Sequence, residues 1–488
     1  MIGLKLTKIL ATFTREEWKE FEKFITSPYF NKGRNYASLT KELKKYSPDF
    51  STEKISETKI YNALYPNKKY NSDILRTHFS NLSKLAEEFL IQQGFKEKIL
   101  ERDFLLLKQL NVKNLDGLHK IQSKKIENTL EKNFDSDSFN DLYIFESEKL
   151  SNAYKGNYDK IIKSGIPKRG EYLVLNFTVK LLTEIRDLIT IEKTFNYEIK
   201  DSLTREVYNE INYQKILDHV EKFYPLYAPQ LRTTVYCYLA AFDPTEQHYV
   251  KAKEMVFKNY SNFSRSRCLN LFLSIEGVIQ EMLQLGHRKF IRQRFLLHKF
   301  MVEKEIYIFQ DEKYIHPRLV INFIINSVWN REFVWLGKFI ANHKEEFPEE
   351  YRSSLTNLGY AYIKYFESKY DEALTLLSRI DNHNFDIKYR VTLLRLFIYA
   401  ETKEYDAAFN SLDSFRHFAR THKNVTGKKR NEFLKISNNV EALIKYKSGD
   451  KTIDLEELRN IISKDPPMLM NDLILEKINE IGVEEKGK

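Results

Sequence analysis

Few residues in this chain could do chemistry, and they do not converge on a reaction. Four carboxylates, Glu345, Glu346, Glu349 and Glu350, surround Pro348, and paired carboxylates can act as general acid and base. The interpretation we favour is an exposed acidic loop between two helices. The eleven histidines include no His-Glu-x-x-His motif and no pair four residues apart, and there is no phosphate-binding glycine loop and no Gly-x-Ser-x-Gly turn. The sequence therefore predicts no catalytic residue, no metal site and no cofactor.

A second cluster of reactive side chains is basic. The segment 287–299 contains no acid and seven basic side chains, His287, Arg288, Lys289, Arg292, Arg294, His298 and Lys299. Arg288 and Arg292 are four residues apart, so they share a helix face, while apolar residues fill the other side. Such a helix can contact an anion, a nucleic acid or an acidic partner, or it can be a solvated face. The predicted contact residues are Arg288, Lys289, Arg292 and Arg294.

The elements that would position these residues are helices. The chain has 15 glycines in 488 residues, about 3%, and 11 prolines, against a usual glycine content of roughly 7%. Strand-rich folds and phosphate loops need glycine where the backbone takes a positive φ. Long helices with short turns need little of it. The composition therefore predicts an all-α chain.

Charge, cysteine content and hydropathy indicate which partners and which compartment the protein could have. The net charge of +10 is spread thinly, so it permits contact with nucleic acid or anionic lipid without indicating it. Cys237 and Cys268 are predicted to be buried small hydrophobes rather than a disulfide or metal ligands. The N-terminal apolar run is too short for a signal peptide, and no run of 18 apolar residues occurs. We expect a soluble, cytoplasmic protein without a membrane span.

Residues 1–95 read as a helical unit. Thr14 and Glu17 predict a capping box, and Pro28 predicts the end of that helix. Further helices are predicted at 36–46 and 55–65, and another begins after Ser72 and Asp73, either of which could cap it. Gly94 predicts its end. Its apolar face is Leu75, Phe79, Leu82, Leu85, Ala86 and Phe89.

The helices at 55–65 and 73–90, joined by the turn 66–70, have the outline of a helix-turn-helix. Their resemblance to the helical part of the winged-helix domain in bacterial activators that also carry helical repeats rests on Leu64, Tyr65, Pro66, Leu75, Arg76 and Leu82. It implies a second helix in the DNA major groove. The side chains that would face the groove are Arg76, Thr77, Ser80, Asn81 and Lys84. The turn is long for this motif, and residues 95–110 read as helix where a wing would follow.

Residues 96–230 read as helices without a clean repeat. Polar breaks are predicted at 111–117 and 133–141, and a break with glycine and lysine at Gly165–Gly170. The apolar segment from Tyr172 to Ile191 could begin as a strand. We interpret it as a buried helix, because the apolar pattern continues at helical spacing.

The last third of the chain contains two stretches that repeat each other 35 residues apart. The first copy is Leu358, Tyr362, Ile363, Tyr370, Asp371, Ala373, Leu377 and Ile380. The second copy is Leu393, Phe397, Ile398, Tyr405, Asp406, Ala408, Leu412 and Phe415. A period of this length is typical of stacked helical hairpins.

Four residues of these copies are predicted to pack the repeat. Ala373 and Ala408 are small enough for two helices to approach closely. Tyr370 and Tyr405 lie one turn earlier on the same face, where they can fill the wedge between hairpins while the hydroxyl reaches solvent or a carbonyl. An aspartate follows each tyrosine, in the first turn of the helix, where its charge suits the helix dipole.

The two copies resemble the tetratricopeptide repeat, whose period is 34. The resemblance covers 350–420 and, more loosely, 230–350. It implies a right-handed solenoid of helical hairpins with a concave groove that holds a peptide or another protein, and it implies no catalytic residue. Two features depart from the family. The small-residue position of the first helix holds Ala361 in one copy and Leu396 in the other, and no proline closes either repeat.

We therefore predict an N-terminal helical domain at 1–95, irregular helical hairpins at 96–230, tetratricopeptide-like repeats at 231–480 and a disordered tail at 481–488. The predicted function is a non-catalytic scaffold or adaptor that holds a protein or peptide partner. The first alternative is a DNA-binding regulator that uses residues 55–90. An enzyme is the least favoured alternative.

Overall fold

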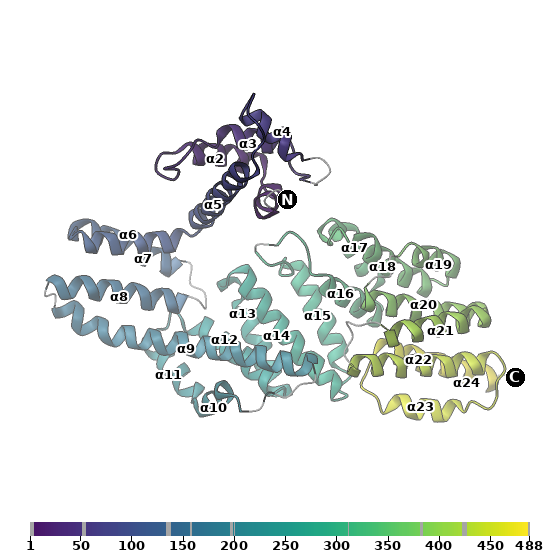
Figure 1. Ribbon diagram of the computed structural model, residues 1–488. Coiled ribbons are helices and arrows are strands. Elements are labelled where there is room, and N and C mark those ends of the chain that lie inside the picture. The colour runs from purple at the N-terminus through teal and green to yellow at the C-terminus, as the bar shows by residue number, and fades with distance from the viewer. Residues whose placement is uncertain are drawn as a thin grey trace. The chain divides into compact units, whose positions relative to one another are not determined.

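The computed structural model describes residues 4–50, 55–132, 138–156, 159–195, 199, 201–310, 312–380, 384–421 and 427–486. Within these residues every regular element is a helix and there is no strand, which confirms the all-α prediction (Figure 1). None of the described helices is long and apolar enough to cross a membrane. The chain divides into two compact units: unit 1 is residues 1–129 and 145–165, and unit 2 is residues 130–144 and 166–488. The predicted boundaries at 95 and 230 lie inside these units and stay predictions.

Among the described residues, six helices lie wholly in unit 1, and three more have residues in both units. The six are α1 (Leu4–Ala11), α2 (Arg15–Thr26), α3 (Ala37–Lys44), α4 (Glu57–Leu64), α5 (Ser72–Glu97) and α6 (Ile99–Val112). The three shared helices are α7 (Asp116–Lys132), α8 (Ser138–Gly156) and α9 (Asp159–Phe195).

Aromatic rings form the centre of the α1–α5 core. Phe13 lies with its ring centroid 5.6 Å from Trp18, 5.3 Å from Phe21 and 5.4 Å from Phe89. Glu17 and Thr14 form the predicted capping box: the Thr14 hydroxyl accepts from the Glu17 backbone N–H at 3.2 Å, and the Thr14 N–H donates to the Glu17 carboxylate at 2.7 Å. This cap fixes the start of α2, so its apolar face meets α5.

Two predictions for residues 1–95 are wrong, and one helix of this region was not predicted. Helix α1 was not predicted, although Leu6, Leu10 and Phe13 are spaced three and four apart and are buried. Helix α5 is capped by Asn71, one residue before the two predicted caps, and its side-chain oxygen accepts from the N–H groups of residues 73 and 74 at 2.9 and 3.1 Å. Gly94 does not end α5, which continues to Glu97. A glycine ends a helix when it takes the left-handed conformation, and Gly94 does not take a positive φ.

Helix α9 runs without interruption through the predicted break at Gly165–Gly170. A Cβ added to Gly165 would lie 2.9 Å from the Glu146 carboxylate and 2.9 Å from the Leu150 side chain of α8. The glycine therefore permits two helices to approach closely and does not break one. The segment from Tyr172 is helical as predicted, but only one of its faces is buried.

The remaining described helices belong to unit 2. They are α10 (Leu203–Glu210), α11 (Tyr213–Phe223), α12 (Ala228–Phe242), α13 (Glu246–Asn259), α14 (Arg265–Gln284), α15 (Phe290–Glu303), α16 (Pro317–Trp329), α17 (Phe333–His343), α18 (Arg352–Phe366), α19 (Tyr370–Ser378), α20 (Phe385–Thr402), α21 (Tyr405–Thr421), α22 (Gly427–Lys447), α23 (Leu455–Ser463) and α24 (Leu469–Lys486), with short 3₁₀ turns at Tyr260–Asn262 and Lys344–Glu346.

From α11 to α24 each helix contacts the next, and α16, α18, α20 and α22 also contact one another in series. The two sequence copies occupy equivalent places, one in α18–α19 and the other in α20–α21. A Cβ added to Gly359 in α18 would lie 2.4 Å from Ile340 of α17. Because Gly359 has no side chain, α17 and α18 of two consecutive hairpins can approach closely.

The C-terminal part of the chain differs from the predicted tail. The sequence predicts a charged helix over roughly 431–447 that ends at Gly449. Helix α22 does end at Lys447, and Gly449 follows with φ of +109°, as a helix stop requires. Helix α24 then continues through the predicted disordered tail to Lys486, and residues 487–488 lie outside the described residues. Glutamate and lysine are good helix formers, and a helix already anchored by buried residues extends readily into such a sequence.

Candidate interaction surfaces

An open cleft lies between α20 and α21, in the second copy of the repeat. It encloses about 390 Å³ and is lined by Lys388, Val391, Thr392, Arg395, Tyr399, Asn410, Ser411, Ser414 and Phe415. The α20 residues recur every three or four positions, so one face of that helix forms one wall. The lining combines two cations, hydroxyl and amide groups and aromatic rings with no carboxylate.

The two cations of the cleft are held in place by their neighbours. The Lys388 ammonium lies 3.8 Å from the centroid of the Phe418 ring, and burial lowers the pKa of this lysine. Arg395 donates from Nη2 to the backbone carbonyl of Leu377, at the end of α19, at 2.8 Å. Neither cation has a carboxylate within ion-pair distance in the described part of the chain. The cleft therefore suits an anionic or acidic ligand better than a cationic one.

The basic segment 287–299 meets carboxylates of the chain itself. Lys289 lies 2.5 Å from Glu246 of α13, and Arg292 lies 2.6 Å from Glu332, just before α17. Arg288 pairs with α24 and Arg294 with α14. Each of the four predicted contact residues thus connects its segment to a different part of unit 2. Their contact with an outside anion stays a prediction.

A buried polar cluster joins α14, α15 and α16. Glu276 accepts at Oε1 from Arg294 Nη2 at 2.9 Å and from Asn322 Nδ2 at 2.9 Å, and His298 Nε2 lies 3.1 Å from the same oxygen. On the other side of the ring, Asn326 Nδ2 lies 3.2 Å from His298 Nδ1. His298 is fully buried, and Glu276 is nearly so.

The charges in this cluster depend on one another. Burial alone would raise the pKa of Glu276, but the charges of His298 and Arg294 and the hydrogen bonds from Arg294 lower it well below the usual range. Burial lowers the pKa of His298, more than the neighbouring carboxylate raises it. The carboxylate is therefore ionised, and Arg294 supplies the permanent opposite charge. This arrangement connects three helices and encloses no cavity among the pockets described for this chain.

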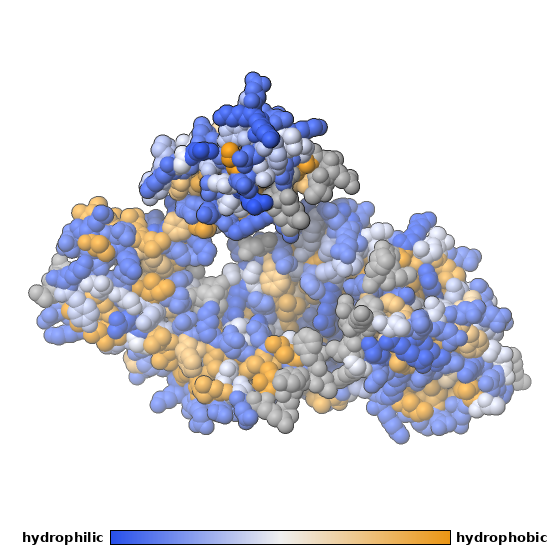
Figure 2. Space-filling model, in the orientation of Figure 1, coloured by the Kyte–Doolittle hydropathy of each residue, from blue (hydrophilic) through white to orange (hydrophobic). Residues whose placement is uncertain are grey.

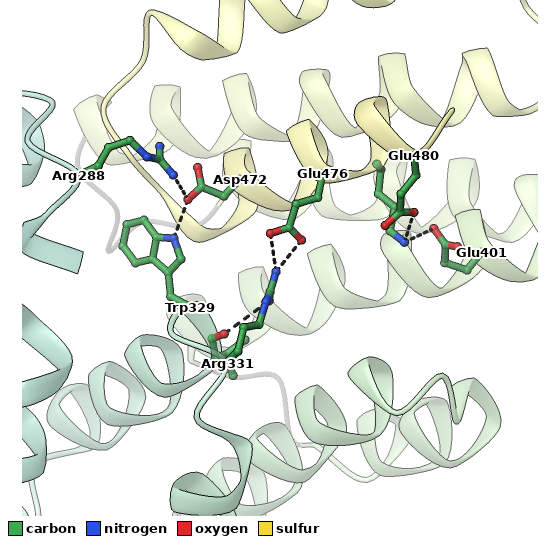
Figure 3. A network of polar contacts seen from close by, with 9 residues as sticks. Arg288, Trp329, Arg331, Glu401, Asp472, Glu476 and Glu480 are labelled. Carbon is green, nitrogen blue, oxygen red and sulfur yellow. Dashed lines mark hydrogen bonds and ion pairs between the residues drawn. The ribbon is translucent and has the colours of Figure 1, made fainter. Parts of the chain in front are cut away.

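The C-terminal helix α24 contacts the ends of several earlier helices through its acidic edge (Figure 3). Asp472 accepts from Arg288 Nη2 at 2.5 Å and from Trp329 Nε1 at 2.8 Å. Arg331 donates to both oxygens of Glu476, at 2.6 and 2.5 Å. The Arg331 guanidinium also lies 4.2 Å from the centroid of the Phe366 ring, at the end of α18.

The same edge continues to the end of α20, where Glu401 lies near Glu480 (Figure 3). Lys477 lies 3.4 Å from Glu401 and 2.7 Å from Glu480, and Lys447 lies 2.9 Å from Glu401. Burial would lower the pKa of Lys477, but the hydrogen bond to Glu480 and the charges of Glu401 and Glu480 raise it. Asp472, Glu476 and Glu480 are four residues apart, so they share one edge of α24. The opposite side is apolar and buried, and α24 contacts α22 and α23.

The four residues predicted to pack the repeat lie at equivalent places. Ala373 and Ala408 are both fully buried. The Tyr405 hydroxyl donates to the Lys447 carbonyl at 2.9 Å, which is the kind of contact predicted for it. The Tyr370 ring lies 6.0 Å from that of Tyr365. Asp371 and Asp406 fall in the first turns of α19 and α21, as expected.

The residues predicted for DNA contact lie on the outer face of α5. Arg76 is strongly exposed, and its nearest carboxylate is that of Asp73, at 4.0 Å. Lys84 is exposed two turns further along. The connection between α4 and α5 covers 65–71, and the next described element is the helix α6, where a winged helix would have strands.

Residues that could serve catalysis are dispersed. No group of three or more His, Cys, Asp or Glu side chains in the described part of the chain could hold a metal ion. Cys237 and Cys268 are buried and free, as predicted, and burial raises the pKa of Cys268 to about 12. Glu345 and Glu349 of the acidic loop are exposed and lie beside Arg352 and Lys313, at 3.3 and 4.0 Å.

Searches of protein-family models, of curated proteins and of solved structures found no match to this chain. The resemblance to the tetratricopeptide repeat therefore rests on the residues quoted above. Sequence reasoning missed the acidic edge of α24 and the cluster around Glu276. The first had a readable signal, three acids four residues apart, whereas the second consists of single polar residues in three apolar helices.

Proposed function

We propose that the chain is a non-catalytic helical scaffold whose hairpins in unit 2 form a tetratricopeptide-like solenoid that holds a protein partner by an acidic peptide segment. The serial contacts of α11–α24 and the equivalent places of the two sequence copies support a stack of hairpins. In such a stack a partner binds along a surface that several helices share, and no reactive group is needed.

The observation that carries this proposal is the cleft between α20 and α21. An extended peptide needs hydrogen-bonding groups for its backbone and a surface for its side chains. Asn410, Ser411 and Ser414 supply the first, and Tyr399 and Phe415 supply the second. Lys388 and Arg395 without a lining carboxylate favour an acidic segment.

The test is affinity purification of the full chain, with mass spectrometry of the proteins it retains. Ser414 is exposed at the cleft, so Ser414→Trp should fill the cleft without disturbing the core and remove the specific partners. Ser463→Trp, at an exposed serine of α23, is the matched control and should retain them. Lys388→Glu should weaken the same interactions. Partners that survive both cleft substitutions, or no specific partner at all, would contradict the proposal.

The second candidate is a DNA-binding regulator, favoured by the exposure of Arg76 and Lys84 on one face of α5. Duplex binding should then weaken steeply with salt, and Arg76→Glu with Lys84→Glu should abolish it while Ser414→Trp leaves it unchanged. The two candidates are separable because they use residues of different units.

A further inference from the structure

The cleft between α20 and α21 contains a buried hydroxyl that no other described residue satisfies. Thr392 lines the cleft and is 7% exposed, and among the described residues its hydroxyl has no hydrogen-bond partner. Loss of hydration without a new partner is costly, so buried polar groups are nearly always satisfied by protein, water or a ligand. Ser411 and Ser414 line the α21 side of the cleft, and their hydroxyls also have no partner within the described part of the chain. A ligand in the cleft therefore meets three hydroxyl groups that can donate to it.

The antiparallel packing of α20 and α21 brings these hydroxyls close together. The two helices are consecutive and contact each other directly. The Lys388 ammonium of α20 lies 3.8 Å from the centroid of the Phe418 ring of α21, which fixes how the two helices are aligned. Thr392 follows Lys388 by four residues and Ser414 precedes Phe418 by four, so these two hydroxyls lie opposite each other. Ser411 lies one turn further along α21, on the same side of the cleft.

Two cations lie on the same line of α20 as Thr392. Lys388 precedes it by four residues and Arg395 follows it by three, so the three side chains share one face of the helix. Arg395 donates from Nη2 to the Leu377 carbonyl at 2.8 Å, and a guanidinium has further N–H groups that can donate to a ligand. No carboxylate is among the described residues that line the cleft. The positive charge of this face is therefore not neutralised by the residues around it.

The donors of this face match a phosphate better than a carboxylate. A phosphorylated residue carries about −1.5 to −2 charges at pH 7 and three acceptor oxygens. A phosphate can therefore neutralise both cations and accept from the hydroxyl groups as well, which a carboxylate with its single charge cannot do. Figure 2 shows hydrophilic residues over much of the surface where Figure 1 labels α20, α21 and α22, with hydrophobic residues among them. Such a surface suits a charged group carried by a peptide.

We propose that the peptide segment held in this cleft carries a phosphorylated residue, whose phosphate accepts from the hydroxyls of both helices and lies between Lys388 and Arg395. The assignment rests on the proposed function and specifies the ligand of the same cleft. Asn410, Tyr399 and Phe415 remain for the peptide backbone and the flanking side chains. Phosphorylation of the partner would then control whether the chain holds it.

The experiment measures how much of three fluorescent peptide mixtures the immobilised full chain retains. All three have random flanks, and the central residue is phosphorylated serine, threonine or tyrosine in the first, the same residues unphosphorylated in the second and glutamate in the third. The wild-type chain should retain the phosphorylated mixture at least about tenfold better than either of the others. Lys388→Gln should reduce that preference about tenfold, because it removes a charge-assisted contact. Lys338→Gln, at an exposed lysine of α17, is the matched control and should leave it unchanged.

Variants of Thr392 distinguish a direct contact from a change of structure. Thr392→Val keeps the shape but removes the hydroxyl and should lose most of the preference, whereas Thr392→Ser keeps the hydroxyl and should retain it.

Equal retention of the phosphorylated and glutamate mixtures, both lost in Ser414→Trp, would overturn the phosphate assignment and leave the acidic-peptide function intact. Complete displacement of the phosphorylated mixture by about 1 mM inorganic phosphate would assign the cleft to the free ion and also overturn it. Retention of no mixture, or retention that Ser414→Trp does not change, would contradict the proposed function and the phosphate assignment together.

Discussion

The cluster around Glu276 and the network along α24 use the same kinds of side chain in opposite surroundings. Each joins helices of unit 2 through carboxylates, guanidinium groups and one aromatic donor or imidazole. The first lies inside α14–α16 and is nearly inaccessible, whereas Arg331 and Glu476 in the second are substantially exposed. The two arrangements therefore contribute differently to stability, although their distances are similar.

Water explains the difference. At an exposed pair, water already solvates both charges, so the contact contributes about 0–1 kcal/mol. In a buried cluster the charges have lost their hydration, and removal of one partner leaves the others without compensation, at about 3–5 kcal/mol. Substitutions in the Glu276 cluster should therefore cost much of the stability of α14–α16, whereas substitutions of exposed pairs along α24 should cost little.

The largest expected effect is that of Glu276→Ala. It removes the acceptor of Asn322 and the only carboxylate that pairs with Arg294 among the described residues, in a buried site, so α14–α16 should lose about 3–5 kcal/mol of stability. Hydrogen exchange of the amides in these helices measures the loss locally, which suits a chain with two units. Glu276→Gln keeps the shape and one acceptor and should cost less. If both variants exchange like the wild type, the cluster does not stabilise these helices.

Acid should also destabilise the buried cluster. Burial lowers the pKa of His298 in the folded chain, so the unfolded chain takes up a proton first as the pH falls below about 6.5. Stability is then fully present above that value and is lost towards acid. The lowered pKa of Glu276 adds a second loss below about 4.3.

The variant His298→Gln cannot titrate and should therefore flatten the pH dependence of stability that sets in below about 6.5. The measurement is hydrogen exchange of α15 with intrinsic rates corrected at each pH. His78 and His119, whose pKa values burial also lowers, lie in unit 1 and serve as an internal reference. An unchanged pH profile in His298→Gln would assign the acid sensitivity to other groups.

Structure was predictable from sequence where it depends on residues only a few positions apart. The capping box at Thr14, the stop at Gly449 and the equivalent places of Tyr370 and Tyr405 follow from short spacings. Gly94 and Gly165 show the limit. Both were predicted to interrupt helices, and both lie inside them, one facing open space and the other against α8. The role of a glycine depends on the neighbouring helix, which spacing alone does not reveal.

The candidate sites were less predictable because their partners are distant in sequence. The basic segment was recognised, but Arg288 pairs with Asp472, 184 residues away. A sequence shows that α24 has an acidic edge, yet it does not show which basic residues meet that edge. The segment from Tyr172 to Ile191 was predicted to be a buried helix because its apolar pattern continues at helical spacing, yet Leu173, Val174 and Phe177 are exposed, and periodicity does not distinguish a covered face from an uncovered one.

The smallest expected effects lie along α24, and they differ between its two halves. Trp329→Phe removes one donor to Asp472, a carboxylate that is mostly buried, so it should cost about 1.5–3 kcal/mol. Arg331→Gln removes an exposed pair with Glu476 and should cost about 0.5–1 kcal/mol, with the contact to Phe366 as part of it. Hydrogen exchange of α24 at low salt measures both losses.

Salt then distinguishes the two halves of α24. The Arg331→Gln difference should shrink between about 0.05 and 0.5 M salt, because screening acts on exposed charges. The Trp329→Phe difference should persist, because the lost donor is neutral and its acceptor is shielded from water. If both differences fell equally with salt, the Asp472 end would be as exposed as the Glu476 end. The proposed difference in stability between the buried Asp472 half and the exposed Glu476 half of α24 would then be wrong.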